Sequence, residues 1–306
     1  MRAVAFTGFG SPPVVTDLPA PTVAPGEVLL RVRASSVNGF DFGVLGGFLK
    51  GTYEYEFPVI LGKDVAGEVV AVGDGISNWA VGDSVFGVIM RPTLGQGGFA
   101  EYVAVPAGYG IARIPDGLDF EQAGALGLAG TAALNAIDAI APEDGETILI
   151  SGATGGVGAY AIQMARARGA TVIATAHPGA QAQLVKDLGA AIVVDRSDVS
   201  AQVRTVAPTG VAGALHLAGD GREVASLVAD GGRFASTVHF TPDDDRDLRA
   251  SVILADPGQH TLNGLAGDVV AGHLRVPLTV SYPLAETLTA LADFSRGTVG
   301  KIGVTM

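Results

Sequence analysis

The sequence contains no cysteine. The chain therefore forms no disulfide, offers no thiolate nucleophile and holds no zinc through sulfur. Long apolar runs are also missing. The N-terminal segment lacks the apolar core of a signal peptide, and no later run reaches the ~18 apolar residues that span a bilayer. We expect a cytoplasmic protein without a membrane partner.

Positive charge is scarce, because 19 Lys and Arg stand against 31 Asp and Glu and give a formal net charge of -12. Such a chain repels nucleic-acid phosphates unless it carries a basic stripe, so we expect no nucleic-acid partner. The acidic residues are densest in the run 243–247, which includes Asp243, Asp244 and Asp245. This run lacks the spaced ligands and the fixed glycine of a calcium loop, and it predicts a solvated loop rather than a metal site.

The pattern of apolar residues changes along the chain. With 48% hydrophobic residues over 306 positions, we expect two domains of the usual ~100–200 residues each. Short alternating runs at 28–34, 65–72 and 84–89 predict the strands of a bent antiparallel β domain. Short strands return near the C-terminus, so we assign residues 1–118 and 277–306 to this domain.

Residues 119–276 alternate between strands and helices, which is typical of a doubly wound parallel sheet in an α/β fold. The first helix starts at Asp119 and has Glu121 in its first turn, at the positive end of the helix dipole. Further helices are predicted at 159–168 and 180–188. Strands are predicted at 147–150, 171–175, 191–195, 213–217, 233–238 and 251–254.

A glycine-rich turn joins the strand 147–150 to the helix 159–168. It reads Ala153-x-Gly155-x-x-Gly158, a variant of the fingerprint that places a dinucleotide pyrophosphate at a helix N-terminus. The pattern alone is weak evidence in a chain with 44 glycines. Its flanking strands and helix complete a βαβ unit of about 30 residues, as the fingerprint requires. We predict that the turn binds the pyrophosphate through Ala153, Thr154, Gly155, Gly156, Val157 and Gly158.

The order of motifs resembles the zinc-free quinone oxidoreductase, or zeta-crystallin-like, branch of the medium-chain dehydrogenase/reductase superfamily over nearly the whole chain. The resemblance implies a GroES-like β domain split around a Rossmann domain, with substrate bound between them, and a homodimer joined through the segment 233–254. The motifs that carry it are 37–41 (VNGFD), 61–67 (LGKDVAG), 81–87 (VGDSVFG), 97–102 (GGFAEY), 153–158 (ATGGVG) and 300–302 (GKI).

The resemblance also bears on metal chemistry. Zinc-dependent relatives bind the metal through a cysteine and a histidine at positions that match Asn38 and Lys63. An amide is a poor zinc ligand and an ammonium has no free lone pair, so we expect no metal. Hydride addition to a quinone or an α,β-unsaturated carbonyl needs no Lewis acid, because conjugation spreads the incoming charge. We therefore expect hydride transfer from a nicotinamide to such a substrate.

Four residues are candidates for catalysis. Asn38 matches the family position near nicotinamide and substrate, although Asn-Gly is also a common turn pair. Asp41 matches a family acid, and an N-cap for the next short helix is an equal alternative. Lys63 departs from the small polar residue usual in the branch; it could donate to the substrate oxygen or form a structural ion pair with Asp64 or Asp41. Tyr53, like its neighbour Tyr55, could stack on a flat substrate.

The end of the second parallel strand selects the cofactor. NADH enzymes place an acid there for the ribose hydroxyls, whereas this chain has Thr175, Ala176 and His177, which favours NADPH. The lysine that grips the 2′-phosphate in relatives is replaced by Gln181. Arg196, assisted by His177, could bind the phosphate instead, although a surface arginine explains the residue too. Further cofactor contacts are expected from Thr131, Leu217, Ala218, Gly219, Thr237 and Val238.

Two other functions remain open. The first is an enoyl-thioester reductase that acts in trans in fatty-acid or polyketide synthesis. Against it, a pantetheine-binding entry should be basic, and Lys50 is the sole basic residue in 48–55. The second is a non-catalytic NADPH-binding protein, against which the intact glycine turn and Asn38 argue mildly. We interpret His216 and His239 as structural rather than catalytic.

Overall fold

The computed structural model describes residues 1–243 and 246–306, so Asp244 and Asp245 of the acidic run lie outside the described residues. The chain forms two compact units, 1–128 with 257–306 and 129–256. The first boundary falls inside helix α2 (Phe120–Ile140) rather than ahead of it. The second falls before α7 (Gln259–Val270), which packs against a strand of the first unit. The domain limits at 118 and 277 stay a prediction.

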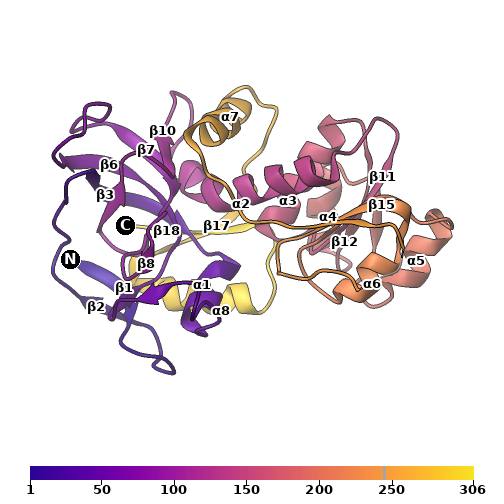
Figure 1. Cartoon of the computed structure of the whole chain (residues 1–306), viewed down its shortest axis with the longest axis horizontal. Coiled ribbons are helices and arrows are strands. Elements are labelled where there is room, and N and C mark those ends of the chain that lie inside the picture. Colours follow the sequence, from indigo (N-terminus) through magenta and orange to yellow (C-terminus); the bar gives the residue numbers. More distant parts are fainter. Residues whose placement is uncertain (244–245) are drawn as a thin grey trace. The chain divides into compact units, whose positions relative to one another are not determined.

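The first unit is built on a mainly antiparallel seven-stranded sheet, in which the C-terminal strand lies among N-terminal strands (Figure 1). The sheet order is β10-β7-β6-β3-β18-β17, with β9 also paired to β3. The sheet strands are β3 (Glu27–Ser36), β6 (Asp64–Val72), β7 (Ser84–Val88), β9 (Tyr102–Pro106), β10 (Ile111–Arg113), β17 (Leu278–Pro283) and β18 (Lys301–Thr305). Strands β17 and β18 are parallel, and β18 pairs antiparallel with β3. The C-terminal strands therefore belong to the same unit as the N-terminal strands, as the sequence pattern predicts.

Smaller elements complete the first unit. A three-stranded sheet has the order β2-β1-β5, and β4 pairs with β8. These elements are β1 (Arg2–Phe6), β2 (Val14–Asp17), β4 (Glu54–Tyr55), β5 (Val59–Ile60), β8 (Thr93–Leu94), α1 (Gly39–Leu45), the 3₁₀ turn η1 (Leu284–Glu286) and α8 (Thr287–Ser295). Alternating burial along β3, with Val28, Leu30 and Val32 inside, gives one face of the sheet to the core.

The second unit is a six-stranded sheet in which every strand pair is parallel. Its order is β13-β12-β11-β14-β15-β16, which winds outward in both directions from the first strand. The strands are β11 (Thr147–Ser151), β12 (Thr171–Thr175), β13 (Ile192–Val194), β14 (Val211–His216), β15 (Val228–Ser236) and β16 (Arg249–Val252). The helices are α3 (Gly156–Ala167), α4 (Ala180–Asp187), α5 (Val199–Val206) and α6 (Gly221–Ser226).

Helix α2 is the one helix of the described residues that is long and apolar enough to cross a membrane by length and composition. Most of it is buried inside the protein, with Ala125, Leu126, Ala133 and Ile137 fully covered. Core helices of globular proteins pass the same test. Its length and composition are therefore those of a core helix as well.

Candidate functional site

Asn38 links β3 to the short helix α1. It occupies the N-cap position, with extended backbone angles, and its N–H donates to Asp41 Oδ2 at 2.8 Å. Asp41 is thus the third residue of the helix, and the alternative that it is the N-cap is wrong because the helix begins at Gly39. A carboxylate in the first turn satisfies an amide that the helix leaves without a partner.

The side chain of Asn38 is fixed by a buried polar network. Its Nδ2 donates to Asp64 Oδ2 at 2.8 Å and to the carbonyl of Ser36 at 3.1 Å, and its Oδ1 accepts from Lys301 Nζ at 2.7 Å. Both amide hydrogens therefore have partners, and the second lone pair of Oδ1 is what the amide has left for a ligand. Direct catalysis by Asn38 stays a prediction.

Asp64 is the centre of this network and was considered from the sequence only as a partner of Lys63. Its Oδ2 accepts from Ser36 Oγ at 2.5 Å and its Oδ1 from the amide of Leu128 at 2.7 Å, and Lys301 Nζ lies 3.5 Å away. Burial lowers the pKa of Lys301, while the charge of Asp64 raises it. The signal that could have found Lys301 is a charged residue at the start of the short, mainly apolar strand Lys301–Thr305.

Asp41 is a buried carboxyl group whose two oxygens are both in use. Oδ2 accepts the amide of Asn38, and Oδ1 accepts the amide of Gly62 at 3.0 Å. Burial raises the pKa of Asp41 to about 7, although both amide hydrogen bonds act in the opposite direction. Asp41 therefore holds the backbone beside Lys63, and it changes charge near neutral pH.

Lys63 is buried without a counter-ion. Among the described residues it forms neither a hydrogen bond nor an ion pair, so the ion pair considered with Asp64 or Asp41 is absent. Its Nζ lies 4.7 Å from the ring centre of Phe40 and 5.9 Å from that of Tyr53. Burial lowers its pKa to about 8, against the raising effect of Asp41 and Asp64.

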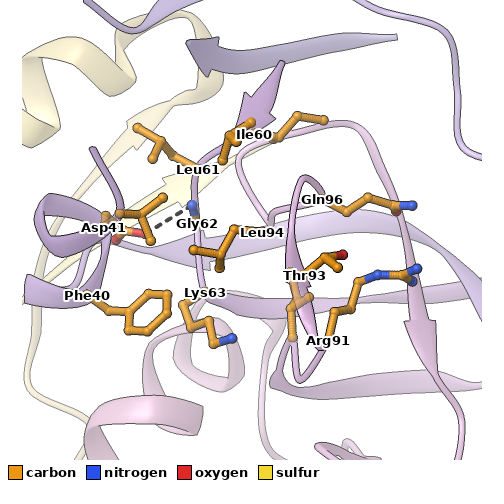
Figure 2. A pocket seen from close by; sticks show the side chains of 13 residues that line it. Phe40, Asp41, Ile60, Leu61, Gly62, Lys63, Arg91, Thr93, Leu94 and Gln96 are labelled. Atoms are coloured by element: carbon orange, nitrogen blue, oxygen red, sulfur yellow. Dashed lines mark hydrogen bonds between the residues drawn. The ribbon is translucent and has the colours of Figure 1, made fainter. Parts of the chain in front are cut away.

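A pocket in the first unit brings Lys63, Phe40 and Asp41 together (Figure 2). It contains about 330 Å³ of empty space, part of it open to solvent, and strand β8 with its flanking residues supplies the opposite wall. Tyr53 does not line this pocket but packs edge-on against Phe40. The lining residues are Phe40, Asp41, Val44, Val59, Ile60, Leu61, Gly62, Lys63, Ile89, Arg91, Thr93, Leu94 and Gln96.

In the second unit, the glycine turn joins β11 to α3. Helix α3 starts at Gly156, and its N-cap, Gly155, has no side chain to satisfy the first amides. The amides of Gly156, Val157 and Gly158 lie in this first turn, where helix geometry provides no carbonyl partner. A Cβ on Gly158 would meet Ala153 Cα at 2.5 Å, so the close approach of turn and helix requires glycine. The turn has the form of an anion site for a pyrophosphate.

The other predicted cofactor residues follow the carboxyl ends of the parallel strands in the second unit. Ser151 Oγ donates to the carbonyl of Ala218 at 2.6 Å, which holds the loop with Leu217 and Gly219 against β11. The amide of Thr237 donates to the carbonyl of His216 at 3.2 Å, and Val238 follows on the surface. These loops therefore meet at one edge of the sheet.

Thr131 and Arg196 are distinctive within this set. Thr131 on α2 is fully buried, and its hydroxyl has no hydrogen-bond partner among the described residues. Arg196 is exposed and forms no hydrogen bond or ion pair there. The pKa of neighbouring Asp195 is lowered mainly by hydrogen bonds from Ser197, with smaller contributions from the charges of His177 and Arg196. His177 is also exposed, with Nδ1 3.9 Å from Asp195, and Ala176 is buried.

The two histidines differ. The ring nitrogens of His216 lie 3.2 Å from Ser236 Oγ and 3.1 Å from the carbonyl of Gly219, which is a structural arrangement. His239 is exposed and has a positive φ of 57°. The described residues contain no group of three or more metal-binding side chains. Zinc does not fit Asn38 and Lys63, because the amide of Asn38 is engaged and an ammonium cannot coordinate.

Comparison with known proteins shows which family the chain belongs to. Residues 24–116 match the Alcohol dehydrogenase GroES-like domain, and residues 156–255 match the Zinc-binding dehydrogenase family. The chain is 30% identical to the Quinone oxidoreductase of Homo sapiens over 324 aligned positions, which cover 97% of this chain and 94% of the relative. The chain belongs to the quinone oxidoreductase family of medium-chain dehydrogenases/reductases.

Two further members of the family agree. The Chloroplast envelope quinone oxidoreductase homolog of Arabidopsis thaliana is 37% identical over 205 residues, which are 64% of this chain and 61% of that protein. The solved quinone oxidoreductase from Coxiella burnetii has a TM-score of 0.91 at 29% identity and covers 100% of this chain and 99% of its own. This member of the quinone oxidoreductase family thus combines a GroES-like unit and a Rossmann unit, and it is an oxidoreductase.

Proposed function

We propose that this member of the quinone oxidoreductase family is an NADPH-dependent, metal-independent reductase of quinones or other α,β-unsaturated carbonyl compounds. The single observation that carries the proposal is the buried, unpaired ammonium of Lys63 in a pocket with apolar walls. A charge in such a place is costly unless a ligand supplies its partner. A carbonyl oxygen that becomes negative during the reaction is such a partner.

The cofactor-binding residues would lie in the second unit. We propose that Ala153, Thr154, Gly155, Gly156, Val157 and Gly158 hold the pyrophosphate of NADPH. The unpartnered hydroxyl of Thr131 supports a buried polar contact with the cofactor. The loops at Leu217, Ala218, Gly219, Thr237 and Val238 would supply backbone contacts. When bound, NADPH provides the hydride that adds to the electron-poor carbon of the conjugated system.

The choice of NADPH over NADH depends on charge. No carboxylate follows β12 in the sequence, where Ala176 is buried and His177 exposed, and this favours a 2′-phosphate. Asp195 lies 3.9 Å from His177 Nδ1, so a 2′-phosphate bound there would need the positive charge of Arg196 to offset that carboxylate. Arg196 is exposed and free to bind that phosphate. Gln181 stands where relatives carry a lysine, and its Oε1 accepts the amide of His177 at 3.1 Å, which leaves the positive charge to Arg196.

Lys63 would act on the substrate oxygen. When hydride adds to the conjugated system, an electron pair moves onto the carbonyl oxygen, and a hydrogen bond from the ammonium stabilises the resulting enolate. The proton that completes the reduction comes from water or from the ammonium itself. Phe40 and Tyr53 offer flat surfaces beside Nζ. Asp41 would position the amide of Gly62 next to Lys63.

We also propose a cytoplasmic homodimer. Strand β16 ends the six-stranded sheet and has no further strand beside it in the described part of the chain. A second copy could pair along Arg249–Val252 and extend the sheet. The enoyl-thioester alternative is less well supported, because Lys50 Nζ lies 3.5 Å above the ring centre of Phe9 and is already engaged.

The test is NADPH oxidation in the presence of a chelator, with product identification, against a quinone, a cyclic enone and an enoyl thioester. Turnover of the quinone or the enone supports the proposal. Turnover of the thioester alone would assign the chain to double-bond reduction in biosynthesis. NADPH binding without turnover of any substrate would favour a non-catalytic binding protein.

A further inference from the structure

The pocket around Lys63 offers hydrogen-bond donors and few acceptors. Both oxygens of Asp41 already accept backbone amides, and Gln96 Oε1 accepts the amide of Ala104 at 2.9 Å. Among the described residues, Lys63 Nζ and Gln96 Nε2 have no hydrogen-bond or ion-pair partner, although Nζ lies over the ring of Phe40 at 4.7 Å. The side-chain polarity of the lining is thus that of a site for an acceptor-rich group.

Arg91 adds to the same wall. Its Nη1 bonds Glu27 at 2.5 Å and the carbonyl of Ala104 at 3.0 Å, while no bond of its other two nitrogens is formed in the described part. Because Arg91 and Gln96 both bond the backbone of Ala104, their ends lie close together, as Figure 2 shows. The hydroxyl of Thr93 lies on this side of the pocket too.

The charged residues around the pocket indicate what kind of ligand would suit Lys63. Arg91 is paired with Glu27, and Lys301 with Asp64, so these four charges cancel in pairs. Asp41 and Asp64 face Lys63 electrostatically, but Asp41 is bonded by two amides and Asp64 by Ser36, Asn38 and Leu128. The amide hydrogen bonds do not neutralise Asp41, so Lys63 and Asp41 are the two charges of this group without an ion-pair partner among the described residues. Of the two, Lys63 is the one whose N–H donors are unused, and a carboxylate is an acceptor-rich group that also supplies negative charge.

We propose that this pocket recognises a carboxylate on the substrate, so that the enzyme prefers conjugated carbonyl compounds that carry a carboxylate to their neutral esters. The inference rests on the proposed function. The ammonium has three N–H donors, which allows it to bond the carboxylate and the reacting carbonyl oxygen of one substrate. Val59, Leu61 and Leu94 cover the hydrocarbon part, and Gln96 and Thr93 donate to the remaining carboxylate lone pairs.

The test compares a naphthoquinone that carries a short carboxyalkyl chain with the methyl ester of the same compound. The two share one electrophile, so a difference in kcat/KM reports recognition of the chain end. We expect the acid to be preferred about ten- to hundredfold near neutral pH, the range for hydrogen bonds to a charged group. A ratio near one, or a preference for the ester, would overturn the inference.

Two variants assign the preference to Lys63. Lys63→Met should bring the ratio of acid to ester close to one, even if both rates fall. Lys50→Met removes an equal charge from an exposed lysine outside the pocket and should leave the ratio unchanged. If Lys50→Met abolished the preference as well, the effect would come from the overall field and the pocket assignment would be wrong.

A binding measurement separates the inference from the proposed function. The naphthalene compounds with the same carboxyalkyl and ester chains cannot be reduced, and their affinities are measured by calorimetry. Tighter binding of the acid by the wild type, lost in Lys63→Met, supports the carboxylate site even if no quinone is turned over. Turnover of both quinones with equal binding of acid and ester would keep the proposed function and contradict the inference.

Discussion

The first unit contains two buried lysines in opposite circumstances. Lys301 is 3% exposed and donates to Asn38 Oδ1 and the Val37 carbonyl, with Asp64 3.5 Å away. Lys63 is 7% exposed and forms no hydrogen bond or ion pair among the described residues. A buried charge whose partner is in the chain cannot be removed without cost, because the partner is then left desolvated and unpaired. A buried charge without one is destabilising, and we attribute its presence to a ligand.

The largest effect should come from removing the paired lysine. Lys301→Met leaves the carboxylate of Asp64 fully buried without its cation. Breaking a buried pair in this way costs about 3–5 kcal/mol, because the remaining charge stays desolvated. We expect the free energy of unfolding in urea to fall by that amount.

A second substitution tests the cause. Adding Asp64→Asn to Lys301→Met removes the uncompensated charge and should recover part of the lost stability, since an amide can still accept from Leu128 or Asn38. If the double variant were less stable than Lys301→Met by the full cost of a second independent loss, the two residues would not act as a pair.

Replacing the unpaired Lys63 should change the free energy of unfolding in the opposite direction. Burial lowers the pKa of Lys63 from 10.5 to about 8, so the unfolded chain binds its proton more tightly than the folded protein does. Lys63→Met should therefore raise the free energy of unfolding at pH 7, by roughly 3 kcal/mol at one pKa unit per 1.36 kcal/mol. The measurement is urea unfolding of both proteins at the same pH.

The pH dependence of this difference is fixed by the same shift. The penalty is complete below pH 8 and disappears as pH rises through the unfolded value of 10.5, where the lysine is neutral in both states. The advantage of Lys63→Met should shrink over this interval. A variant that is less stable than the wild type at pH 7 would mean that Lys63 has a stabilising partner.

Enzyme activity should also depend on the protonation state of Lys63. If the ammonium stabilises the enolate, kcat/KM of the wild type falls about tenfold for each pH unit above the pKa of Lys63, near 8. Lys63→Arg keeps its charge to higher pH, so the decrease in kcat/KM should begin at a higher pH. In Lys63→Met the decrease should be absent. A profile that is flat up to pH 10 in the wild type would exclude Lys63 as the charged donor.

Most of the fold could be predicted from the sequence, because the spacing of apolar residues and the Gly and Pro residues that end helices and strands are local signals. The strand 171–175 matches β12 residue for residue, and the alternating run 84–89 matches β7 to within one residue. The helix predicted at 159–168 starts at Gly156 instead. The reason is that the glycine turn continues into the first helical turn, which apolar periodicity does not reveal.

The candidate site was harder to predict, because its decisive contacts join residues far apart in the chain. Asp64 and Asp41 are the obvious partners of Lys63 by sequence distance, yet Asp64 pairs with Lys301, 237 positions away. Asp41 is held by amides at Asn38 and Gly62. Which lysine receives the counter-charge depends on the register of β18 against β3, and no local pattern encodes that register.

Arg196 extends the comparison to a cation that is unpaired because it is exposed. Water solvates such a charge, so Arg196→Ala should leave the free energy of unfolding within about 0.5 kcal/mol of the wild type. If Arg196 binds the 2′-phosphate, the variant should lose about five- to tenfold in NADPH affinity and little in NADH affinity, as expected for one solvent-screened charge contact. Fluorescence titration with both cofactors measures the two losses. Equal losses would show that Arg196 does not distinguish the phosphate, and a large loss of stability would show that its side chain is structural after all.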